Sequence, residues 1–522
     1  MAKYLYGAAA QGIQSFIFQT NKLIEIVGAS ELVEEICTSK FAEMVYGSGE
    51  GARKALKNDK GRAILYAAGN IKYIFDDKEK CASVVREFPK RISTFAPGVT
   101  LSQAVVEFED AGDPKKFTEA VNELERRLRI QRNKQMRSNT LGLMGIERSR
   151  ETGLPVSHIV GNDHFDLARY AKLYDSNDER QRTTQTLCKK AFGQFYGEAE
   201  ICYDFENMKG TNDWIAVIHA DGNGLGQVVQ KIGENKDAFR EFSNNLDAAT
   251  TESAVAAFKA VSEKYKWGKR VPIRPIVLGG DDLTVVCRAD LAVDYVLEFI
   301  RHFEASTKEK LGDVLSKKKV FEKGSVTDRL TACAGIAFVK SSYPFYYAYE
   351  LAEALCSRAK KDAKNKTDIK AGKELPQSCI MFHKVQDSFA EEYEEIVKRE
   401  LMPCDNMSFE FGPYYLNEKD GRWTVEDLLD KVKSLSGEDS DDEKEANAAK
   451  TGLRQWMTLL HRNAEMADQK RNRMIEISRL KGLLREVTEW ENRDGRKVCP
   501  VYDIMALHTI MTQNTNNEDD GK

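Results

Sequence analysis

The chain has 522 residues, of which 42% are hydrophobic, so it can bury several cores and is not a disordered polypeptide. Its 78 lysines and arginines against 82 aspartates and glutamates give a net charge of -4, which excludes a global attraction to nucleic acid or to anionic membranes. The first residues lack the pattern of a secretory signal, no apolar run approaches a membrane span, and the ten cysteines include no C-x-x-C pair. These features predict a cytoplasmic protein that binds no membrane and has no disulfide framework or zinc ribbon.

Residues 1–135 are predicted to form a βαββαβ unit of the ferredoxin-like type. A strand at 3–6 leads into a turn of small residues, and residues 67–75 have the pattern of a hairpin tip. A strand at 99–108 and a helix at 117–130 complete the unit. The end of this helix is basic and could contact an RNA backbone, although a solvated helix face explains it equally well. The basic residues are Arg126, Arg127, Arg129, Arg132, Lys134 and Arg137.

Residues 208–390 are predicted to repeat the βαββαβ order with carboxylates at the strand ends. An apolar strand at 213–219 runs into the sequence ADGNGLG, and two more strands at 273–278 and 283–287 flank the sequence GGDD. Two apolar strands joined in this way are typical of a β-hairpin with its carboxylates at the tip. The remaining elements are expected at 289–305 (helix), 317–319 (a lysine-rich insertion), 330–339 (strand), 346–360 (helix) and 379–382 (edge strand).

The first unit matches the second in spacing but lacks its acidic residues. When AAGNIKYIF is laid beside LGGDDLTVV, Gly69 falls on Gly280. The places of Asp221, Asp281 and Asp282 are taken in the first unit by Ala8, Asn70 and Ile71. The sequence therefore predicts two palms, the first stripped of metal ligands.

Asp221, Asp281 and Asp282 are the predicted catalytic and metal-ligating residues. A two-metal site needs carboxylates that bridge two hard cations, so that one metal activates a hydroxyl and the other holds a triphosphate. In a ferredoxin-like sheet the end of the first strand lies beside the tip of the central hairpin, so we expect the three side chains to meet there. We expect two Mg²⁺ or Mn²⁺ ions, with Asp221 and Asp282 as principal ligands and Asp281 closest to a 3′ hydroxyl.

Backbone amides and one lysine are expected to bind the nucleoside triphosphate. Glycine-rich turns can cradle phosphate oxygens because the backbone can approach closely. The residues expected to do so are Gly222, Asn223, Gly224 and Leu225 after the first strand, with Gly279 and Gly280 at the hairpin. Lys360 is a candidate point charge on the triphosphate, and a solvated helix lysine is an equally good interpretation. His219 could as easily be a core residue as a base.

Either motif alone is usually only a turn, but the two together within one βαββαβ frame are much more specific.

The region 136–207 is predicted to be polar and largely helical, and 391–436 to be a mixed connecting region. The acidic run 437–445 is expected to be a solvated linker within 437–522, followed by a helical domain and a disordered tail at 514–522. The predicted fold class is therefore α+β, with two ferredoxin-like palms, the first degenerate, and helical inter-palm and C-terminal domains.

Over residues 3–384 the chain resembles the large polymerase-cyclase subunit of type III CRISPR effector complexes. The sequences that carry the resemblance are GIQSFIFQTNKLIEIVGASELV at 12–33, ADGNGLG at 220–226, LGGDD at 278–282, ACAGIAFV at 332–339 and the pair Ala359-Lys360. Many members also have an HD nuclease domain and a four-cysteine zinc module between the palms. Here we expect neither, because the HD pair is limited to Asp163-His164 and the stretch 142–155 contains no cysteine.

The resemblance implies an inactive first palm packed against an active second one. It also implies that the enzyme condenses ATP into 3′-5′ cyclic oligoadenylates, which serve as second messengers in antiviral defence. It implies that Asp221, Asp281 and Asp282 hold the metals, and that other effector subunits and guide or target RNA are partners. Two alternatives remain open. A single-product cyclase of the diguanylate type usually has Glu-Phe where this chain has Asp282-Leu283, and a non-catalytic RNA-binding scaffold would not need the three aspartates.

Overall fold

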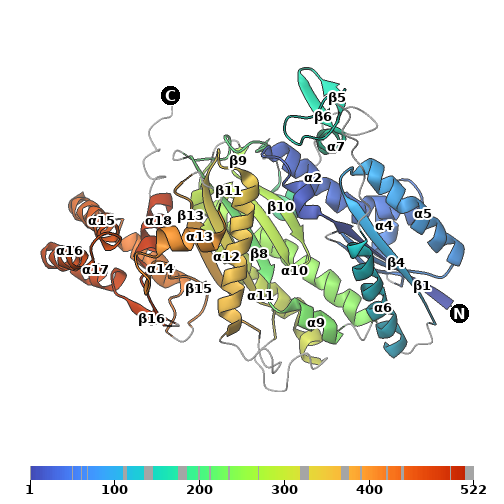
Figure 1. The fold of residues 1–522 in the computed structure, drawn as a ribbon. Coiled ribbons are helices and arrows are strands. Elements are labelled where there is room, and N and C mark those ends of the chain that lie inside the picture. The colour runs from blue at the N-terminus through green and yellow to red at the C-terminus, as the bar shows by residue number, and fades with distance from the viewer. Residues whose placement is uncertain are drawn as a thin grey trace.

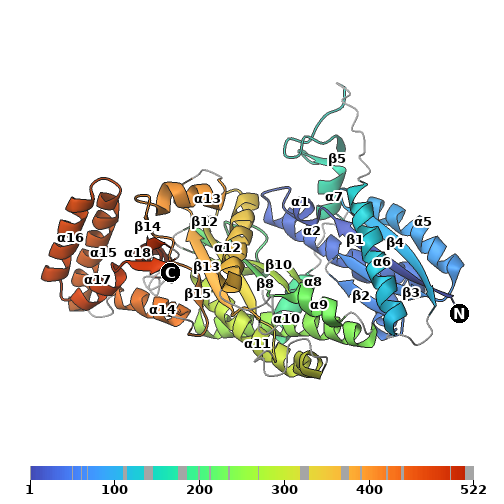
Figure 2. The ribbon, with the colours of Figure 1, turned by 60° about the horizontal axis from the view of Figure 1, so that its bottom comes forward.

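The computed structural model has a mixed α+β architecture, which confirms the predicted fold class. Two palms lie side by side and a helical region follows at the end of the molecule farthest from the N-terminus (Figures 1 and 2). The structure describes residues 2–511 except 50, 60, 68, 110–113, 135–144, 175–184, 198–199, 211–212, 233–235, 268–269, 318–327, 366–374, 388–390, 419–420, 437–439 and 494. The expected lysine insertion beyond 317, the basic residue at 137 and the expected tail at 514–522 lie outside the described residues. No helix in the described part is long and apolar enough to span a bilayer.

The second palm is built on a six-stranded sheet in the order β10-β11-β8-β12-β13-β15. The first four strands have the order expected for a ferredoxin-like unit, with the first strand of the unit, β8, at the centre beside the hairpin strand β11. The strands are β8 (Trp214–Gly222), β10 (Ile273–Gly279), β11 (Asp282–Arg288), β12 (Ala332–Lys340), β13 (Cys379–Lys384) and β15 (Tyr414–Tyr415).

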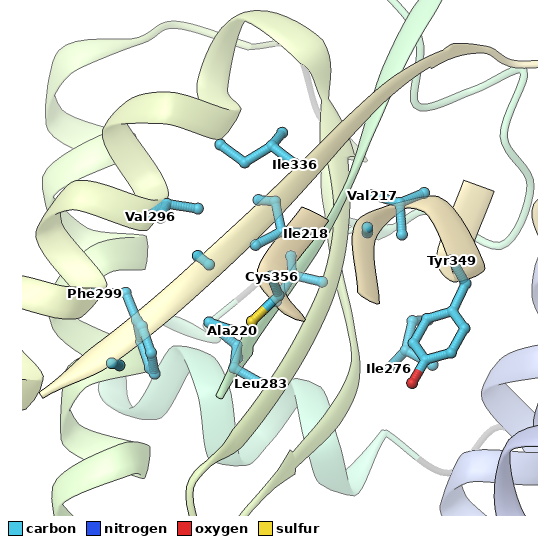
Figure 3. Close-up of a cluster of buried hydrophobic side chains, with 14 of the residues drawn as sticks. Val217, Ile218, Ala220, Ile276, Leu283, Val296, Phe299, Ile336, Tyr349 and Cys356 are labelled. Atoms are coloured by element: carbon cyan, nitrogen blue, oxygen red, sulfur yellow. The ribbon is translucent and has the colours of Figure 1, made fainter. Parts of the chain in front are cut away.

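Helices cover both faces of this sheet because its strands are apolar on both sides. α10 (Lys236–Lys264) and α11 (Ala292–Lys317) pack together, and Figure 3 shows Val296 and Phe299 of α11 against β8 and β12. α12 (Phe345–Asn365) lies on the other face. It approaches so closely at Gly335 of β12 that a Cβ there would lie 2.0 Å from the carbonyl oxygen of Ala352.

The first palm has a four-stranded sheet in the order β2-β3-β1-β4, which is the same topology. In this sheet Ala8 pairs with Ile71. In the second palm Ala220 pairs with Leu283, and the residues next to this pair on the two strands are Asp221 and Asp282. Gly69 and Gly280 both have positive φ, 76° and 63°. The first strand thus pairs with the hairpin in the predicted way in both palms, but the hairpin turn differs by one residue, since Ala67 pairs with Asn70 and Gly279 pairs with Asp282. The strands are β1 (Ala2–Gln11), β2 (Ala63–Ala67), β3 (Asn70–Phe75) and β4 (Thr100–Glu109), flanked by α5 (Lys78–Phe95) and α6 (Pro114–Asn133).

The region between the palms is only partly helical. It contains α7 (Leu167–Leu173) and α8 (Thr186–Phe192), but also a hairpin of β5 (Val156–Val160) and β6 (Asp163–Asp166) that projects from the palms (Figure 2). The polar composition did not reveal this hairpin, because its strands are short and half-exposed. α7 packs on α2 (Leu23–Glu35) of the first palm at Gly28, where a Cβ would lie 1.8 Å from the carbonyl oxygen of Lys172.

The C-terminal part combines a helical bundle with a small three-stranded sheet in the order β14-β17-β16. The acidic run expected to be a linker is helical from Ser440, where α15 begins. Glu443 and Glu445 of this run therefore lie near the beginning of a helix, where the helix dipole favours negative charge. The elements are β14 (Met407–Ser408), β16 (Glu491–Arg493), β17 (Arg496–Val498), α14 (Val425–Ser434), α15 (Ser440–Leu460), α16 (Ala464–Ile477), α17 (Lys481–Val487) and α18 (Val501–Met511).

Candidate functional site

The structure brings the three predicted aspartates to one end of the second sheet. Asp221 is near the end of β8, and Asp282 is the first residue of the neighbouring strand β11. Gly279 pairs with Asp282, so Gly280 and Asp281 form a two-residue connection whose first position has positive φ and favours glycine. Asp281 packs against Gly222, where a Cβ would lie 2.9 Å from the Asp281 Cβ.

The cluster carries more negative charge than its surroundings stabilise. Burial, followed by the negative charge of Asp221, raises the pKa of Asp281 to about 8, and the same causes raise the pKa of Asp282 to about 7. Lys360 of α12 is the cation that lies among them. Its Nζ forms an ion pair with Asp221 and donates a hydrogen bond to the carbonyl oxygen of Gly222, 2.9 Å away. Lys360 therefore lies within the aspartate cluster and is not a solvated helix lysine.

The hairpin that presents Asp281 and Asp282 is held along its outer edge by three side chains. β10 is the last strand of the sheet, so its outward carbonyl groups have no strand partner. Ser30 of α2 donates to the carbonyl of Ile276, Lys190 of α8 donates to Leu278 at 3.1 Å, and Thr250 of α10 donates to Gly280 at 2.6 Å. The first palm, the inter-palm region and the second palm each contribute one of these contacts.

A cavity of about 620 Å³ opens between the two palms beside this cluster. Of the predicted site residues, Asp221, Asp282 and Gly279 line it. Asp281 does not, because in the two-residue turn its side chain points toward Gly222, so Asp282 and not Asp281 faces the space for a substrate. The other predicted residues, Gly222, Asn223, Gly224, Leu225, Gly280 and Lys360, support the cluster from outside the cavity lining.

The turn after β8 is less open to phosphate than its sequence predicts. The backbone N–H of Asn223 donates to the carbonyl of Thr331 at 2.8 Å, and the Asn223 side chain donates to the Thr331 hydroxyl at 3.1 Å. The Asn223 amide is therefore occupied, which corrects the expectation that it binds a phosphate oxygen. Gly224 has a φ of 69° and contacts Leu375, so glycine here serves the turn and a close approach.

His219 lies in the wall of the same cavity and is buried. Its Nδ1 is 3.3 Å from the hydroxyl of Thr284, and its ring meets Tyr349 edge-on. Burial lowers the pKa of His219 to about 4, so the ring is neutral at physiological pH. It can form hydrogen bonds to a substrate but cannot supply a positive charge.

Residues of the first palm form the opposite wall of the cavity, and the sequence did not predict which residues these are. Gln14 of α1 (Ile13–Ile17) donates to Tyr349 at 2.9 Å and to Glu353 at 3.4 Å, and Phe18 packs on Tyr349 with ring centroids 4.0 Å apart. Asn21 accepts from the backbone N–H of Phe345 at 3.0 Å. The 12–33 motif thus docks the first palm on α12.

One face of helix α12 lines the cavity, and the spacing of its residues can be recognised in the sequence. The cavity-lining residues of α12 are Tyr346, Tyr349, Glu350 and Glu353. They recur at helical spacing, and Lys360 lies two further turns along the same face. Helical periodicity extended backwards from Lys360 would have identified them.

The donor set suits hard cations. Mg²⁺ is commonly bound through one or two carboxylates together with phosphate oxygens and water, and Asp221 and Asp282 offer two adjacent carboxylates. Within the described ranges no three His, Cys, Asp or Glu side chains converge on one point that could hold a metal. Two adjacent carboxylates fit a cation whose other ligands come from a triphosphate and water.

Comparison with known proteins agrees with this geometry. Residues 214–369 match the family model described as Cas10/Cmr2, second palm domain. That match contains the three aspartates and Lys360. No curated protein matches the chain.

Solved structures of low sequence identity share the fold. The Csm1-Csm4 cassette in complex with cA4 has a chain that is 13% identical with a TM-score of 0.55, and the match covers 98% of this chain and 69% of that chain. Csm1 of T. onnurineus matches at 15% identity and the same TM-score and coverage. The cassette in complex with AMPPNP matches at 13% identity and a TM-score of 0.53, also over 98% and 69% of the two chains. The shared fold extends over both palms and into the C-terminal region.

Proposed function

We propose that this Cas10-like chain, whose residues 214–369 are a second palm domain of the Cas10/Cmr2 type, is a metal-dependent nucleotidyl cyclase. Its reaction would condense ATP into 3′-5′ cyclic oligoadenylate in type III CRISPR or related antiviral defence. The observation that supports this most directly is the adjacency of Asp221 and Asp282 on the wall of a 620 Å³ cavity, with Lys360 beside them. The cA4 and AMPPNP in the similar cassettes support adenine nucleotides as the substrate class.

Asp221 and Asp282 are the residues that would hold Mg²⁺ or Mn²⁺. When bound, such ions would lower the pKa of a 3′ hydroxyl and neutralise a triphosphate. Asp281, buried against Gly222, would add negative charge that favours cation binding. The raised pKa values of Asp281 and Asp282 describe a cluster that gains from a bound cation, since cation binding favours the ionised form.

The remaining residues would bind and orient the reactants. Lys360 would exchange its contact with Asp221 for a phosphate oxygen, because a flexible ammonium group can bind either acceptor. The neutral ring of His219 and the hydroxyl of Tyr349 offer uncharged hydrogen bonds to sugar or base. Gln14, on the first palm, lines the cavity from the other side and would contact a bound nucleotide there.

Assembly with other effector subunits and with guide or target RNA is part of the proposal. Two of the similar structures are cassettes of Csm1 with Csm4, which supports a partner subunit for this chain. The basic end of α6 is a weaker candidate for RNA binding, because Glu123 pairs with both Arg126 and Arg127 at 2.7 Å. These arginines are partly neutralised within their own helix.

The test is to incubate purified protein with Mg²⁺ or Mn²⁺ and each nucleoside triphosphate, with and without RNA and partner subunits. Products are resolved by chromatography and mass spectrometry. Asp281→Ala with Asp282→Ala should abolish cyclic oligoadenylate while leaving the fold nearly intact, since hairpin-tip carboxylates contribute little to a core. The matched control is Glu309→Ala with Asp313→Ala, which removes two exposed carboxylates of α11 outside the cavity.

Each alternative has its own signature in this assay. A dinucleotide made from GTP alone would favour a diguanylate-type cyclase. Absence of product with every nucleotide and RNA, in an assembled and folded complex, would favour a non-catalytic scaffold. Unfolding of the Asp281/Asp282 variant would assign the carboxylates a structural role.

A further inference from the structure

A second cavity, of about 330 Å³, lies between the C-terminal end of α12 and the short strands of the C-terminal part. Its wall includes Arg358 and Lys361 from α12 and Arg422 from the segment before α14. β16 and β17 supply Arg493 and Arg496. The carboxylates in the same wall are Asp362 and Glu410, so the lining is strongly basic although the chain as a whole is weakly acidic.

Three of these cations have carboxylate partners. Arg358 donates to both oxygens of Glu410 at 2.9 and 2.7 Å, and Arg422 donates to Asp362 at 2.7 Å. Arg493 donates to Glu491 at 3.0 and 2.6 Å.

The cavity retains an excess of positive charge after this pairing. For Lys361 and Arg496, both exposed, no carboxylate partner is present among the residues that the structure describes. Two cations at the mouth of a small basic cavity would attract an anion.

The inner part of the cavity is also short of hydrogen-bond acceptors. Arg422 is 8% exposed, and its Nε is buried without an acceptor in the described part of the chain. Burial, followed by the positive charge of Arg422, lowers the pKa of Arg493, so two guanidinium groups are held close together in a poorly solvated wall. Arg493 already donates from all three guanidinium nitrogens, to Glu491 and to the carbonyl of Phe411, so an anion here would chiefly offset the positive charge of the two neighbouring guanidinium groups.

We propose that this cavity binds a small phosphate-bearing ligand, with its phosphate or diphosphate group held by Arg422, Arg493, Arg496 and Lys361. The volume is at the small end for ligand sites, which suits a phosphate or diphosphate group better than a long polymer. The site is separate from the aspartate cluster, although α12 lines both cavities. Binding here does not require the proposed cyclase reaction.

The test uses inorganic pyrophosphate as the probe, titrated into the full chain by calorimetry in buffer without divalent cations. Under these conditions the carboxylates around Asp221 repel pyrophosphate, so the measurement reports the basic cavity. Lys361→Gln with Arg496→Gln should weaken binding by about tenfold or more, since each removes a charge-assisted hydrogen bond. Both residues are exposed, so the fold should survive, which a thermal melt would verify.

Two controls separate this site from general charge effects and from the catalytic proposal. Lys364→Gln with Lys497→Gln removes two exposed lysines from the same helix and strand but outside the cavity lining, and should leave the affinity unchanged. Lys360→Gln, at the aspartate cluster, should also leave it unchanged. A defect in cyclase activity would therefore not affect the outcome.

Three results would overturn the proposal. The first is no saturable pyrophosphate binding by the wild-type chain. The second is equal loss in the Lys361/Arg496 and Lys364/Lys497 variants. The third is tight binding of a short RNA, lost in the Lys361/Arg496 variant, when pyrophosphate and free nucleotides do not saturate the site; this would assign the cavity to an RNA backbone.

Discussion

Thr250→Val tests whether the contacts along the outer edge of β10 position the hairpin that carries Asp281 and Asp282. The Thr250 hydroxyl donates to the carbonyl of Gly280 at 2.6 Å, next to Asp281, and also lies 3.0 Å from the carbonyl of Leu246 in its own helix. Valine keeps the shape of the side chain and removes only the hydroxyl. The neighbouring Thr251 is a matched control, because its buried hydroxyl has no hydrogen-bond partner within the described chain.

The expected magnitudes follow from the contact that is lost. One hydrogen bond to a half-buried carbonyl contributes about 1 kcal/mol to the free energy of unfolding. A displacement of about 1 Å at reacting groups can reduce turnover about hundredfold, so we expect kcat to fall between about tenfold and hundredfold while KM for ATP changes little. Thr251→Val should keep wild-type kcat and equal or higher stability, since it removes an unpaired polar group.

The assay is cyclic oligoadenylate formation in the assembly that supports turnover, paired with urea unfolding of the same samples. Wild-type kcat in Thr250→Val would refute the positioning role, even if the protein were less stable. An equal loss of kcat in Thr251→Val would show that any valine in this turn of α10 impairs activity. The loss could then not be attributed to the hydrogen bond to Gly280.

The remaining predictions concern the cation at the cluster, a buried acid and a close helix contact. Lys360→Gln should reduce product formation by about hundredfold or more in the chromatographic assay, because it removes a preorganised charge; full activity would contradict its role. Burial raises the pKa of Asp503, which accepts a hydrogen bond from Tyr414 at 2.7 Å, to about 7. Because its folded pKa lies above its unfolded value, its stabilising contribution is complete below about pH 4 and is lost as the pH rises through about 7. Between pH 4 and pH 7 the free energy of unfolding of the wild type, measured in urea, should therefore fall by about 4 kcal/mol more than that of Asp503→Asn. Equal falls in the two proteins would refute the raised pKa of Asp503. Gly28→Ala should cost about 3 kcal/mol in urea unfolding, because its Cβ would lie 1.8 Å from the Lys172 carbonyl; an unchanged midpoint would mean that α2 and α7 can separate freely.

The strand order and the meeting of the aspartates were predictable because they follow from local patterns. The strand that ends near Asp221 and the strand that begins at Asp282 are neighbours in a ferredoxin-like sheet. The pairing of Ala220 with Leu283 shows this arrangement. The degenerate first palm was predictable for the same reason, since Ala8 and Ile71 occupy equivalent places.

Contacts between distant residues were not predictable from one sequence. The glycine-rich context of Asn223 predicted that its backbone amide binds phosphate. In the structure this amide donates to Thr331, which lies more than a hundred residues away, and is not free to bind phosphate. The direction of Lys360 depends on how closely α12 packs at Gly335, and the role of Gln14 depends on how the palms dock. The boundaries of the inter-palm and C-terminal domains stay proposals.

The side chains along β10 have a second consequence, which concerns association with other chains. A strand at the end of a sheet exposes carbonyl and amide groups that can pair with a strand from another molecule and begin aggregation. Here the carbonyls of Ile276, Leu278 and Gly280 already accept hydrogen bonds from α2, α8 and α10. The three helices lie over this border of the sheet and leave little room for an incoming strand. The contacts that hold the hairpin tip therefore also protect the largest sheet of the molecule from intermolecular pairing along β10.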